Sequence, residues 1–261
     1  MRKSKKVLIL RFSSYGDVAI MIPVLRALSK AYPLDEFVAA SRPKMGPIFH
    51  EFKNIYFHPL DIDNEFKGFT GIFRLFKRLR NLNPTHIADL HYVIRTRIIG
   101  FLFRVLGYKV RRIDKGRKQK NALTRIKNKL FEPLTPTVFR YSKVFSKLGF
   151  RMDITKTEII QKNPLPEKLK DFFYSDKKKW IAIAPFASYE GKTYPLDLMQ
   201  KVVVFLQRDY KIFLLGAGKK EEELLQVWSK AYINCWNAST GLDFQEQLNA
   251  LPFLDLMISM D

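Results

Sequence analysis

A short polar turn near the amino terminus carries the first residues that could do chemistry. Ser13, Ser14, Gly16 and Asp17 follow residues 7–10, an apolar run typical of a buried parallel strand. Ligands of open α/β sheets bind at the carboxyl ends of strands, so we expect this turn at the mouth of a cleft. A carboxylate there can act as a general base, and it can equally cap the helix that follows. The residues alone leave both roles of Asp17 open.

Two later segments also join a strand to polar groups. Residues 183–195, IAPFASYEGKTYP, run from a strand into a turn that holds Ser188 and Lys192. A lysine at that edge can neutralise charge that grows on a departing diphosphate, although an isolated loop lysine is usually just solvated. Residues 213–223, FLLGAGKKEEE, place Glu221 and Glu222 in the first turn of a helix. Such carboxylates can hold ribose hydroxyls, and they also suit the helix dipole.

These segments, taken in order along the chain, resemble those of glycosyltransferase family 9, the lipopolysaccharide heptosyltransferases. Residues 11–33, RFSSYGDVAIMIPVLRALSKAYP, look like the opening motif of that family. Residues 183–195 resemble the segment that opens its second domain, and residues 213–223 resemble its nucleotide-contacting segment. The final ISMD resembles the stretch whose Asp precedes a turn that binds the donor's phosphates through backbone amides. The resemblance therefore spans nearly the whole chain.

The resemblance implies an inverting, metal-independent transfer of a heptose or similar sugar to a lipopolysaccharide-core hydroxyl. It implies a nucleotide-diphosphate donor, with ADP-heptose favoured, and Asp17 as the general base. The donor-binding residues would be Ser188, Lys192, Glu221, Glu222 and Asp261, with Glu221 preferred to Glu222 for the ribose. The acceptor-binding residues would be Ser14, Gly16, His91, Arg95, Arg111, Arg112, Arg117 and Lys118. Lys192 would stabilise the departing diphosphate in place of a metal.

The charge is strongly positive. In 261 residues, 46 Lys and Arg stand against 25 Asp and Glu, a net charge of +21, which predicts attraction to polyanions. Residues 109–129 carry ten of these cations and a single acid, Asp114. We interpret this basic run as a solvated loop that docks a phosphorylated acceptor or anionic lipid. It lacks interleaved aromatic residues, so we expect no nucleic-acid partner.

The cysteines and histidines give information on the compartment of the protein and on metal binding. Cys235 is the single cysteine, so no internal disulfide can form, which fits a reducing compartment. The four histidines lack the spacing of a zinc motif, and we expect neither a metal nor another cofactor. No apolar run reaches the length of a signal peptide or a membrane span. We therefore expect a cytoplasmic protein that can lie peripherally on the cytoplasmic face of the inner membrane.

Alternating strand and helix patterns predict an α/β fold with two Rossmann-like domains, the GT-B architecture that the resemblance implies. We expect an acceptor-binding domain over residues 1–163, a linker over 164–178 and a nucleotide-sugar-binding domain over 179–261. The predicted strands are residues 7–10, 36–40, 54–57, 86–90, 181–184, 211–215, 233–236 and 254–260. The predicted helices begin at residue 18 and cover residues 68–81, 95–106, 137–148, 196–207, 221–231 and 244–250.

The end of the sequence suggests that the second domain is incomplete. A parallel strand needs a covering helix, and none follows the last predicted strand, so we expect truncation and weak activity. Two alternatives remain at this point. One is a non-enzymatic protein that binds polyanions or a membrane surface, and nucleotide binding would argue against it. The other is a GT-B enzyme that uses a different nucleotide sugar.

Overall fold

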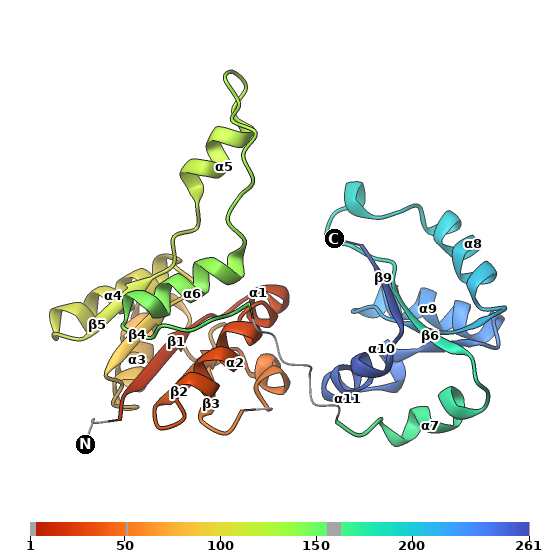
Figure 1. Ribbon diagram of the computed structural model, residues 1–261, viewed down its shortest axis with the longest axis horizontal. Coiled ribbons are helices and arrows are strands. Elements are labelled where there is room, and N and C mark those ends of the chain that lie inside the picture. The colour runs from red at the N-terminus through yellow and green to blue at the C-terminus, as the bar shows by residue number, and fades with distance from the viewer. Residues whose placement is uncertain (1–3, 51, 156–162, 261) are drawn as a thin grey trace. The chain divides into compact units, whose positions relative to one another are not determined.

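The chain forms two compact units, Met1–Glu158 and Ile159–Asp261, in a computed structural model (Figure 1). The structure describes residues 4–50, 52–155 and 163–260. Each unit contains one parallel sheet between layers of helices, so the predicted α/β fold with two Rossmann-like domains is confirmed.

The first unit is built on a five-stranded parallel sheet with the strand order β3-β2-β1-β4-β5. Its strands are β1 (Lys6–Leu10), β2 (Glu36–Ser41), β3 (Ile55–Pro59), β4 (His86–Asp89) and β5 (Lys109–Arg112). β1 lies in the middle, where Leu10 pairs with Ala40 on one side and Asp89 on the other. The loops that follow β1 and β4 therefore start side by side at one edge of the sheet.

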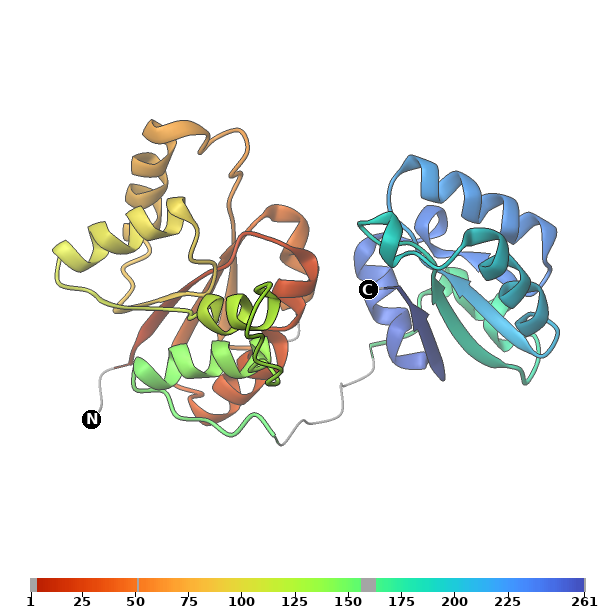
Figure 2. The same ribbon diagram turned by 90° about the horizontal axis from the view of Figure 1, so that it is seen from above.

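Helices cover both faces of this sheet. They are α1 (Tyr15–Ala19), α2 (Ile22–Ala31), α3 (Gly68–Arg80), α4 (Ile94–Val105), α5 (Arg117–Thr124) and α6 (Thr137–Lys147), with a 3-10 helix over Pro43–Phe49. Val7 and Ile9 pack in one core with α2 and α6, whereas Leu8 and Leu10 pack in another with α3 and α4. Figure 2 shows these layers on opposite sides of the sheet. Burial on both faces explains why β1 is a continuous apolar run.

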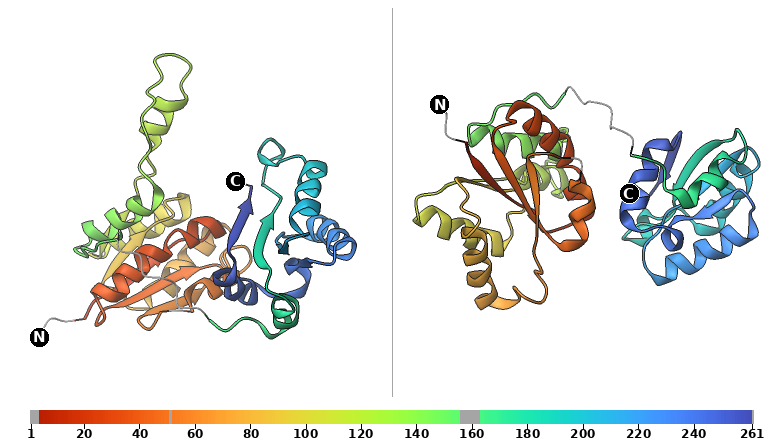
Figure 3. Two further views of the ribbon diagram at one scale, coloured as in Figure 1. Left: turned by 45° about the vertical axis from the view of Figure 1, so that its right-hand side comes forward. Right: turned by 90° about the horizontal axis from the view of Figure 1, so that it is seen from below.

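The second unit repeats the plan on a smaller scale (Figure 3). Its four parallel strands have the order β8-β7-β6-β9. The strands are β6 (Lys179–Ala184), β7 (Tyr210–Leu214), β8 (Cys235–Asn237) and β9 (Leu256–Ser259). The helices are α7 (Glu167–Tyr174), α8 (Leu196–Leu206), α9 (Lys219–Ala231), α10 (Ala238–Gly241) and α11 (Phe244–Ala250), with 3-10 turns at Glu190–Lys192 and Leu251–Phe253. Ile181 and Ile183 face α8 and α9, while Trp180 and Ala182 face α7.

The first predicted helix is two helices. α1 ends at Ala19 and α2 begins at Ile22, with Pro23 in its first turn. A proline has no N–H to donate and clashes with the preceding turn, so it is tolerated only where a helix begins. The apolar spacing continues across the break, which is why the sequence pattern alone did not reveal it.

The segment 164–178, expected to be a linker, contains helix α7. Its Leu169 and Phe173 are buried in the core of the second unit, where the Phe173 ring packs at a tilt against Trp180 with ring centroids 3.8 Å apart. Pro164 and Pro166 suggested a break in structure, but Pro166 directly precedes the first residue of α7. Proline at a helix start is favourable, so this signal marked a boundary within the unit.

The sequence suggested that the basic run 109–129 is a loop, but the structure shows otherwise. It contains the edge strand β5 and the helix α5. β5 pairs with β4, and its single buried residue, Val110, packs under α4 in the core. One apolar residue among cations gives no alternation, so the strand had no visible signature. No helix in the described part of the chain is long and apolar enough to span a bilayer.

Candidate active site

A buried arginine organises the carboxyl edge of the first sheet. Arg11 comes directly after β1 and is only 7% exposed. Its guanidinium forms an ion pair with Asp17, and Nη1 donates to the carbonyl oxygen of Leu90 at 2.8 Å. Leu90 directly follows β4, so one side chain joins the loops after two neighbouring strands. Asp17 is thereby fixed at the sheet edge where the sequence predicted it.

Asp17 lies in the first turn of α1, and its carboxylate also caps that helix. Oδ2 accepts hydrogen bonds from the backbone N of Ser14 at 3.2 Å and from the Ser14 hydroxyl at 3.1 Å. The hydroxyl of Tyr141 donates to the Asp17 carbonyl oxygen at 3.2 Å. The Asp17 side chain nevertheless remains 38% exposed, so an incoming group can reach it. Capping and chemistry are therefore compatible at this residue.

Electrostatics keeps the Asp17 carboxyl ionised. Partial burial raises its pKa, but the hydrogen bonds from Ser14 and the charge of Arg11 outweigh burial, so the net pKa lies below the ordinary 3.8. A general base must be deprotonated before it acts, and Asp17 meets that condition at neutral pH. The same surroundings raise the pKa of Tyr141 to about 12, chiefly through burial, so this phenol stays protonated.

A cationic cavity of about 480 Å³ opens beside Asp17. Its walls include Arg11, Lys115, Lys120 and Arg140, with Asp17 as the single acid. Burial lowers the pKa of Lys115, and repulsion from Arg11 and Arg117 lowers it further. The four cations suit an anionic ligand, and the carboxylate among them can take a proton from that ligand.

His91 lies at the same edge, where the sequence expected it, and it is held in a neutral state. Its Nε2 is 3.4 Å from the Ser13 hydroxyl, and its backbone N donates to Asp89 at 3.0 Å. Burial, followed by the positive charges of Arg11 and Lys115, lowers the pKa of His91 to about 4. Its Nδ1 is buried with no hydrogen-bond partner among the described residues. This ring can offer a neutral hydrogen-bonding group to a ligand, but not a charge.

The predicted basic residues separate into two groups. Arg112, Arg117 and Lys118 line a hollow of about 660 Å³ between β5, α5 and α6, together with Lys115, Arg140, Lys143 and Lys147. Arg111 is not part of this hollow. It neighbours Arg112 on a strand, so its side chain points to the opposite face, where Nη1 donates to the Val110 carbonyl at 3.0 Å. Arg95 also has a structural bond, from Nη1 to the Ile62 carbonyl at 3.1 Å.

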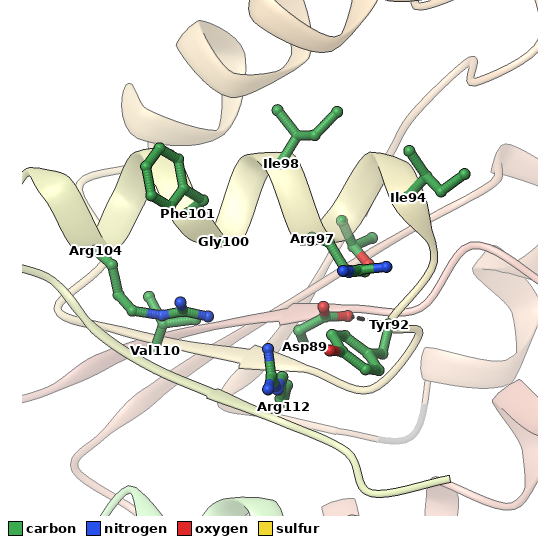
Figure 4. A pocket seen from close by; sticks show the side chains of 11 residues that line it. Asp89, Tyr92, Ile94, Arg97, Ile98, Gly100, Phe101, Arg104, Val110 and Arg112 are labelled. Carbon is green, nitrogen blue, oxygen red and sulfur yellow. Dashed lines mark hydrogen bonds between the residues drawn. The ribbon is translucent and has the colours of Figure 1, made fainter. Parts of the chain in front are cut away.

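Sequence reasoning missed Arg97 and Arg104, which form a second arginine cluster with Arg112. A groove of about 450 Å³ lies between α4 and β5. Figure 4 shows Arg97, Arg104 and Arg112 on its walls. The guanidinium carbons of Arg97 and Arg112 lie 5.5 Å and 4.6 Å from the centre of the Tyr92 ring. The seven-residue spacing of Arg97 and Arg104 places them on one face of a helix, and this spacing could have revealed the pair.

In the second unit, Ser188 and Lys192 lie exposed in the loop after β6. Two contacts connect this loop to its neighbours at the carboxyl edge. The backbone N of Tyr194 donates to the sulfur of Met260 at 3.4 Å. A Cβ at Gly216, in the turn after β7, would lie 3.2 Å from the Phe186 ring and 2.8 Å from Leu225. The loops after β6, β7 and β9 therefore meet at one edge.

Glu221 and Glu222 lie at this edge but already have partners. Glu221 accepts from the backbone N of Ala217 at 2.8 Å, and Glu222 accepts from that of Gly218 at 3.2 Å. Both carboxylates therefore cap the start of α9, as their position in its first turn allows. Asp261 lies outside the described residues. Within the described ranges, no group of three His, Cys, Asp or Glu side chains is arranged to hold a metal ion.

Three residues next to Asp17 were not identified as site residues from the sequence: Arg11, Lys115 and Tyr141. Arg11 was recognisable in principle, because it directly follows a buried strand and precedes a carboxylate by six residues. Lys115 belongs to the basic run, but nothing distinguished it from its neighbours. Tyr141 reaches Asp17 from α6, 124 residues away, which no local pattern reveals.

The comparisons with known proteins identify the family. The model of glycosyltransferase family 9 (heptosyltransferase) matches residues 72–261, more than half of the chain. The chain belongs to this family. It is 23% identical to the lipopolysaccharide core heptosyltransferase OpsX of Haemophilus influenzae over 267 residues, covering 98% of this chain and 74% of OpsX. The family resemblance inferred from the sequence is confirmed.

Solved structures of the family share the fold. A family 9 glycosyltransferase from Veillonella parvula matches with a TM-score of 0.72 and 19% identity, covering 98% of this chain and 74% of its own. The Escherichia coli heptosyltransferase WaaC, solved with ADP, matches with a TM-score of 0.67 and 16% identity, covering 98% and 81%. A putative UDP-N-acetylglucosamine 2-epimerase from Listeria monocytogenes also matches, with a TM-score of 0.57 and 14% identity over 98% and 74%. The fold thus extends beyond this family.

The pKa of His91 gives a direct test of the site's electrostatics. We expect its Cε1 proton resonance to titrate with a midpoint near 4, below the ordinary 6.5, and Lys115→Met to raise that midpoint because a repelling charge is removed. Lys118→Met, which removes an exposed cation from the same segment, is the matched control and should leave the midpoint unchanged.

The pKa of His91 also makes stability depend on pH. Between about pH 4 and 6.5, the unfolded chain binds more protons at His91 than the folded chain does. The contribution of His91 to stability is therefore complete above about pH 6.5 and is lost as the pH falls towards 4. A midpoint at or above 6.5 would contradict this description.

Proposed function

We propose that this family 9 glycosyltransferase moves a heptose from ADP-heptose to a hydroxyl of a lipopolysaccharide-core acceptor, with inversion at the anomeric carbon. The observation that carries the proposal is an ionised carboxylate, Asp17, on the wall of a cationic cavity at the carboxyl edge of the first sheet. The donor is favoured because WaaC has been solved with ADP and with ADP-2-deoxy-2-fluoro heptose. The acceptor class is favoured by the name of the OpsX relative.

Asp17 is the proposed general base. The acceptor oxygen attacks the anomeric carbon as the bond from that carbon to the diphosphate breaks, and the acceptor's proton passes to a carboxylate oxygen of Asp17. A single displacement of this kind inverts the anomeric configuration. Because its pKa is lowered, Asp17 is a weak base for a free hydroxyl, and it takes the proton only as the attacking oxygen acquires positive charge. The ion pair with Arg11 keeps the carboxylate deprotonated and oriented until then.

The acceptor is proposed to bind in the first unit. Anionic groups on a lipopolysaccharide core suit the cations of the two hollows around Lys115, which include Arg112, Arg117 and Lys118. Gly16 and Ser14 flank Asp17, and the position of a Cβ at Gly16 has no atom within 4 Å, so a sugar can approach the backbone there. His91 supplies a neutral hydrogen-bonding group, and Arg95 lines an adjoining hollow with Arg117. Arg111 lines neither of these hollows, and we assign it to general attraction of the anionic acceptor.

The donor is proposed to bind at the carboxyl edge of the second unit. Lys192 neutralises charge on the departing diphosphate, so the reaction proceeds without a metal ion, and Ser188 donates to the same group. Glu221, with Glu222 as the alternative, accepts from the ribose hydroxyls through lone pairs beyond those used in capping. Asp261 lies next to the end of β9 in the sequence, and the proposal keeps it among the donor-binding residues. Transfer takes place on the cytoplasmic side, at an anionic inner-membrane surface.

Asp17→Asn should abolish most sugar transfer, and it should also lower stability, because the buried Arg11 guanidinium loses its carboxylate partner. The variant is therefore compared with the starting enzyme below its own unfolding temperature, where circular dichroism shows it folded. An asparagine keeps the capping geometry but accepts no proton, and loss of a general base typically lowers the rate about 10²–10⁴-fold. The measurement is turnover of ADP-heptose in the full-length enzyme, together with donor affinity by calorimetry, which should change little.

The matched control is Glu246→Gln, because Glu246 is the third residue of α11 and accepts from the backbone N of the capping Asp243 at 2.9 Å, as Asp17 accepts from that of Ser14. That variant should retain turnover within a few-fold of the starting enzyme. If Asp17→Asn also stays within a few-fold, Asp17 is only a helix cap.

Lys192→Ala should weaken ADP binding by about tenfold or more and leave adenosine binding unchanged, since a hydrogen bond to a charged group is worth about 1.5–3 kcal/mol. Calorimetry with both ligands measures the difference. Lys201→Ala, an exposed lysine on α8, serves as the charge-matched control. Equal losses for ADP and adenosine would argue against a phosphate contact at Lys192. A chain that binds neither would favour a non-enzymatic, polyanion-binding role.

A further inference from the structure

A projecting arm, residues 114–135, separates β5 from α6. It consists of α5 and the loop that returns from it, and Figure 1 shows it extending away from the sheet of the first unit. Three large apolar side chains on the returning loop face water: Ile126 is 94% exposed, Phe131 82% and Leu130 51%. No residue of α5 is buried. The core of the first unit therefore gives no reason for apolar residues at this place.

Cations surround these apolar residues. The arm carries two acids, Asp114 and Glu132, against seven lysines and arginines: Lys115, Arg117, Lys118, Lys120, Arg125, Lys127 and Lys129. In the described ranges, none of these seven forms an ion pair with a carboxylate. The four that lie nearest the apolar residues in sequence are Lys120, Arg125, Lys127 and Lys129. Long cationic side chains around an apolar tip match a surface that is negative outside and apolar beneath.

The arm is held firmly at its base. Arg140, on α6, donates to the carbonyl oxygens of Thr135 at 2.9 Å and Asp114 at 3.1 Å, and to Gln119 at 2.9 Å. Gly116 makes this possible, because a Cβ there would lie 2.3 Å from the Arg140 guanidinium. The Leu130 backbone N donates to the Ala122 carbonyl at 3.0 Å, which fastens the returning loop to α5. The apolar residues are thus presented on an anchored support.

We propose that the arm is a membrane anchor, which inserts Ile126, Leu130 and Phe131 into the interface of an anionic bilayer while its lysines and arginines contact lipid phosphates. This inference deepens the proposed function, on which it rests for the membrane-bound acceptor. Burial of the three side chains supplies apolar free energy, and each cation near the surface adds electrostatic attraction to the lipid phosphates. The hollow lined by Arg112, Arg117 and Lys118 lies at the base of the arm, so insertion brings the acceptor-binding cations close to the lipid headgroups.

The first test is co-sedimentation of the full-length protein with vesicles of phosphatidylglycerol and phosphatidylethanolamine. The combined variant Ile126→Ser, Leu130→Ser and Phe131→Ser should reduce the partition coefficient at least about tenfold, because the removed apolar burial exceeds 1.4 kcal/mol. The matched control is Leu34→Ser, which removes an apolar side chain that is 86% exposed between α2 and β2. That variant should bind vesicles like the parent protein. Binding of the parent should also fall steeply with added salt.

The second test locates the inserted residue. Phe131→Cys, labelled with a polarity-sensitive fluorophore, should shift its emission to the blue on anionic vesicles and be quenched by spin-labelled lipids. Leu34→Cys, labelled in the same way, should do neither. Selective labelling is feasible because the one native thiol, Cys235, is buried, and burial raises its pKa to about 12.

Three outcomes would overturn the anchor. One is unchanged vesicle binding of the triple serine variant, and another is an unshifted label at position 131. The third is sedimentation of the parent protein without lipid as a dimer that the triple variant dissociates, which would make the tip a contact between copies. Transfer to a water-soluble, delipidated core acceptor separates this inference from the proposed function. That activity should survive in the triple variant, and its absence from the parent protein would contradict the enzyme rather than the anchor.

Discussion

The ion pair between Arg11 and Asp17 is the interaction on which the first unit's site depends. A guanidinium that is almost fully buried is costly unless it is paired and hydrogen-bonded. Arg11 is paired with the carboxylate of Asp17 and donates to the Leu90 carbonyl, while its Nε is buried without a hydrogen-bond partner among the described residues. The loops after β1 and β4 are thereby held together, and the same charge lowers the pKa of both Asp17 and His91. Arg11 therefore contributes to both the geometry and the protonation of the site, alongside the burial of His91 and the Ser14 hydrogen bonds to Asp17.

Much of the fold could be predicted because burial leaves a local signature. Strands covered on both faces are continuous apolar runs, and helices between them show the 3.6-residue period, so residues 7–10 and 181–184 were recognisable. β5 and α7 were not. β5 has a single buried residue, and α7 follows two prolines that look like a break but precede a helix start. β5 and α7 are stabilised by contacts with residues far away in the chain, and a local sequence pattern does not reveal such contacts.

The candidate site, like the fold, contains some residues that the sequence reveals and others that it does not. Asp17 and Lys192 could be selected because each lies in the turn that follows a strand, and in a parallel sheet that position fixes the edge on which a residue lies. Tyr141 and Arg140 reach the site from α6, so only the folded chain connects them to Asp17. Arg111 and Arg112 looked equivalent until strand alternation separated them. Glu221 and Glu222 show a different difficulty. A carboxylate in the first turn of a helix can cap that helix or bind a ligand, and the sequence does not distinguish the two roles.

The most direct test of the central claim is the transfer reaction itself. The full-length enzyme would be incubated with ADP-heptose and a heptose-free lipopolysaccharide core, and the product would be detected by mass spectrometry and its anomeric configuration by NMR. The account predicts a core enlarged by one heptose, with release of ADP and inverted configuration relative to the donor. Retained configuration, or transfer from a UDP-sugar but not from ADP-heptose, would contradict it.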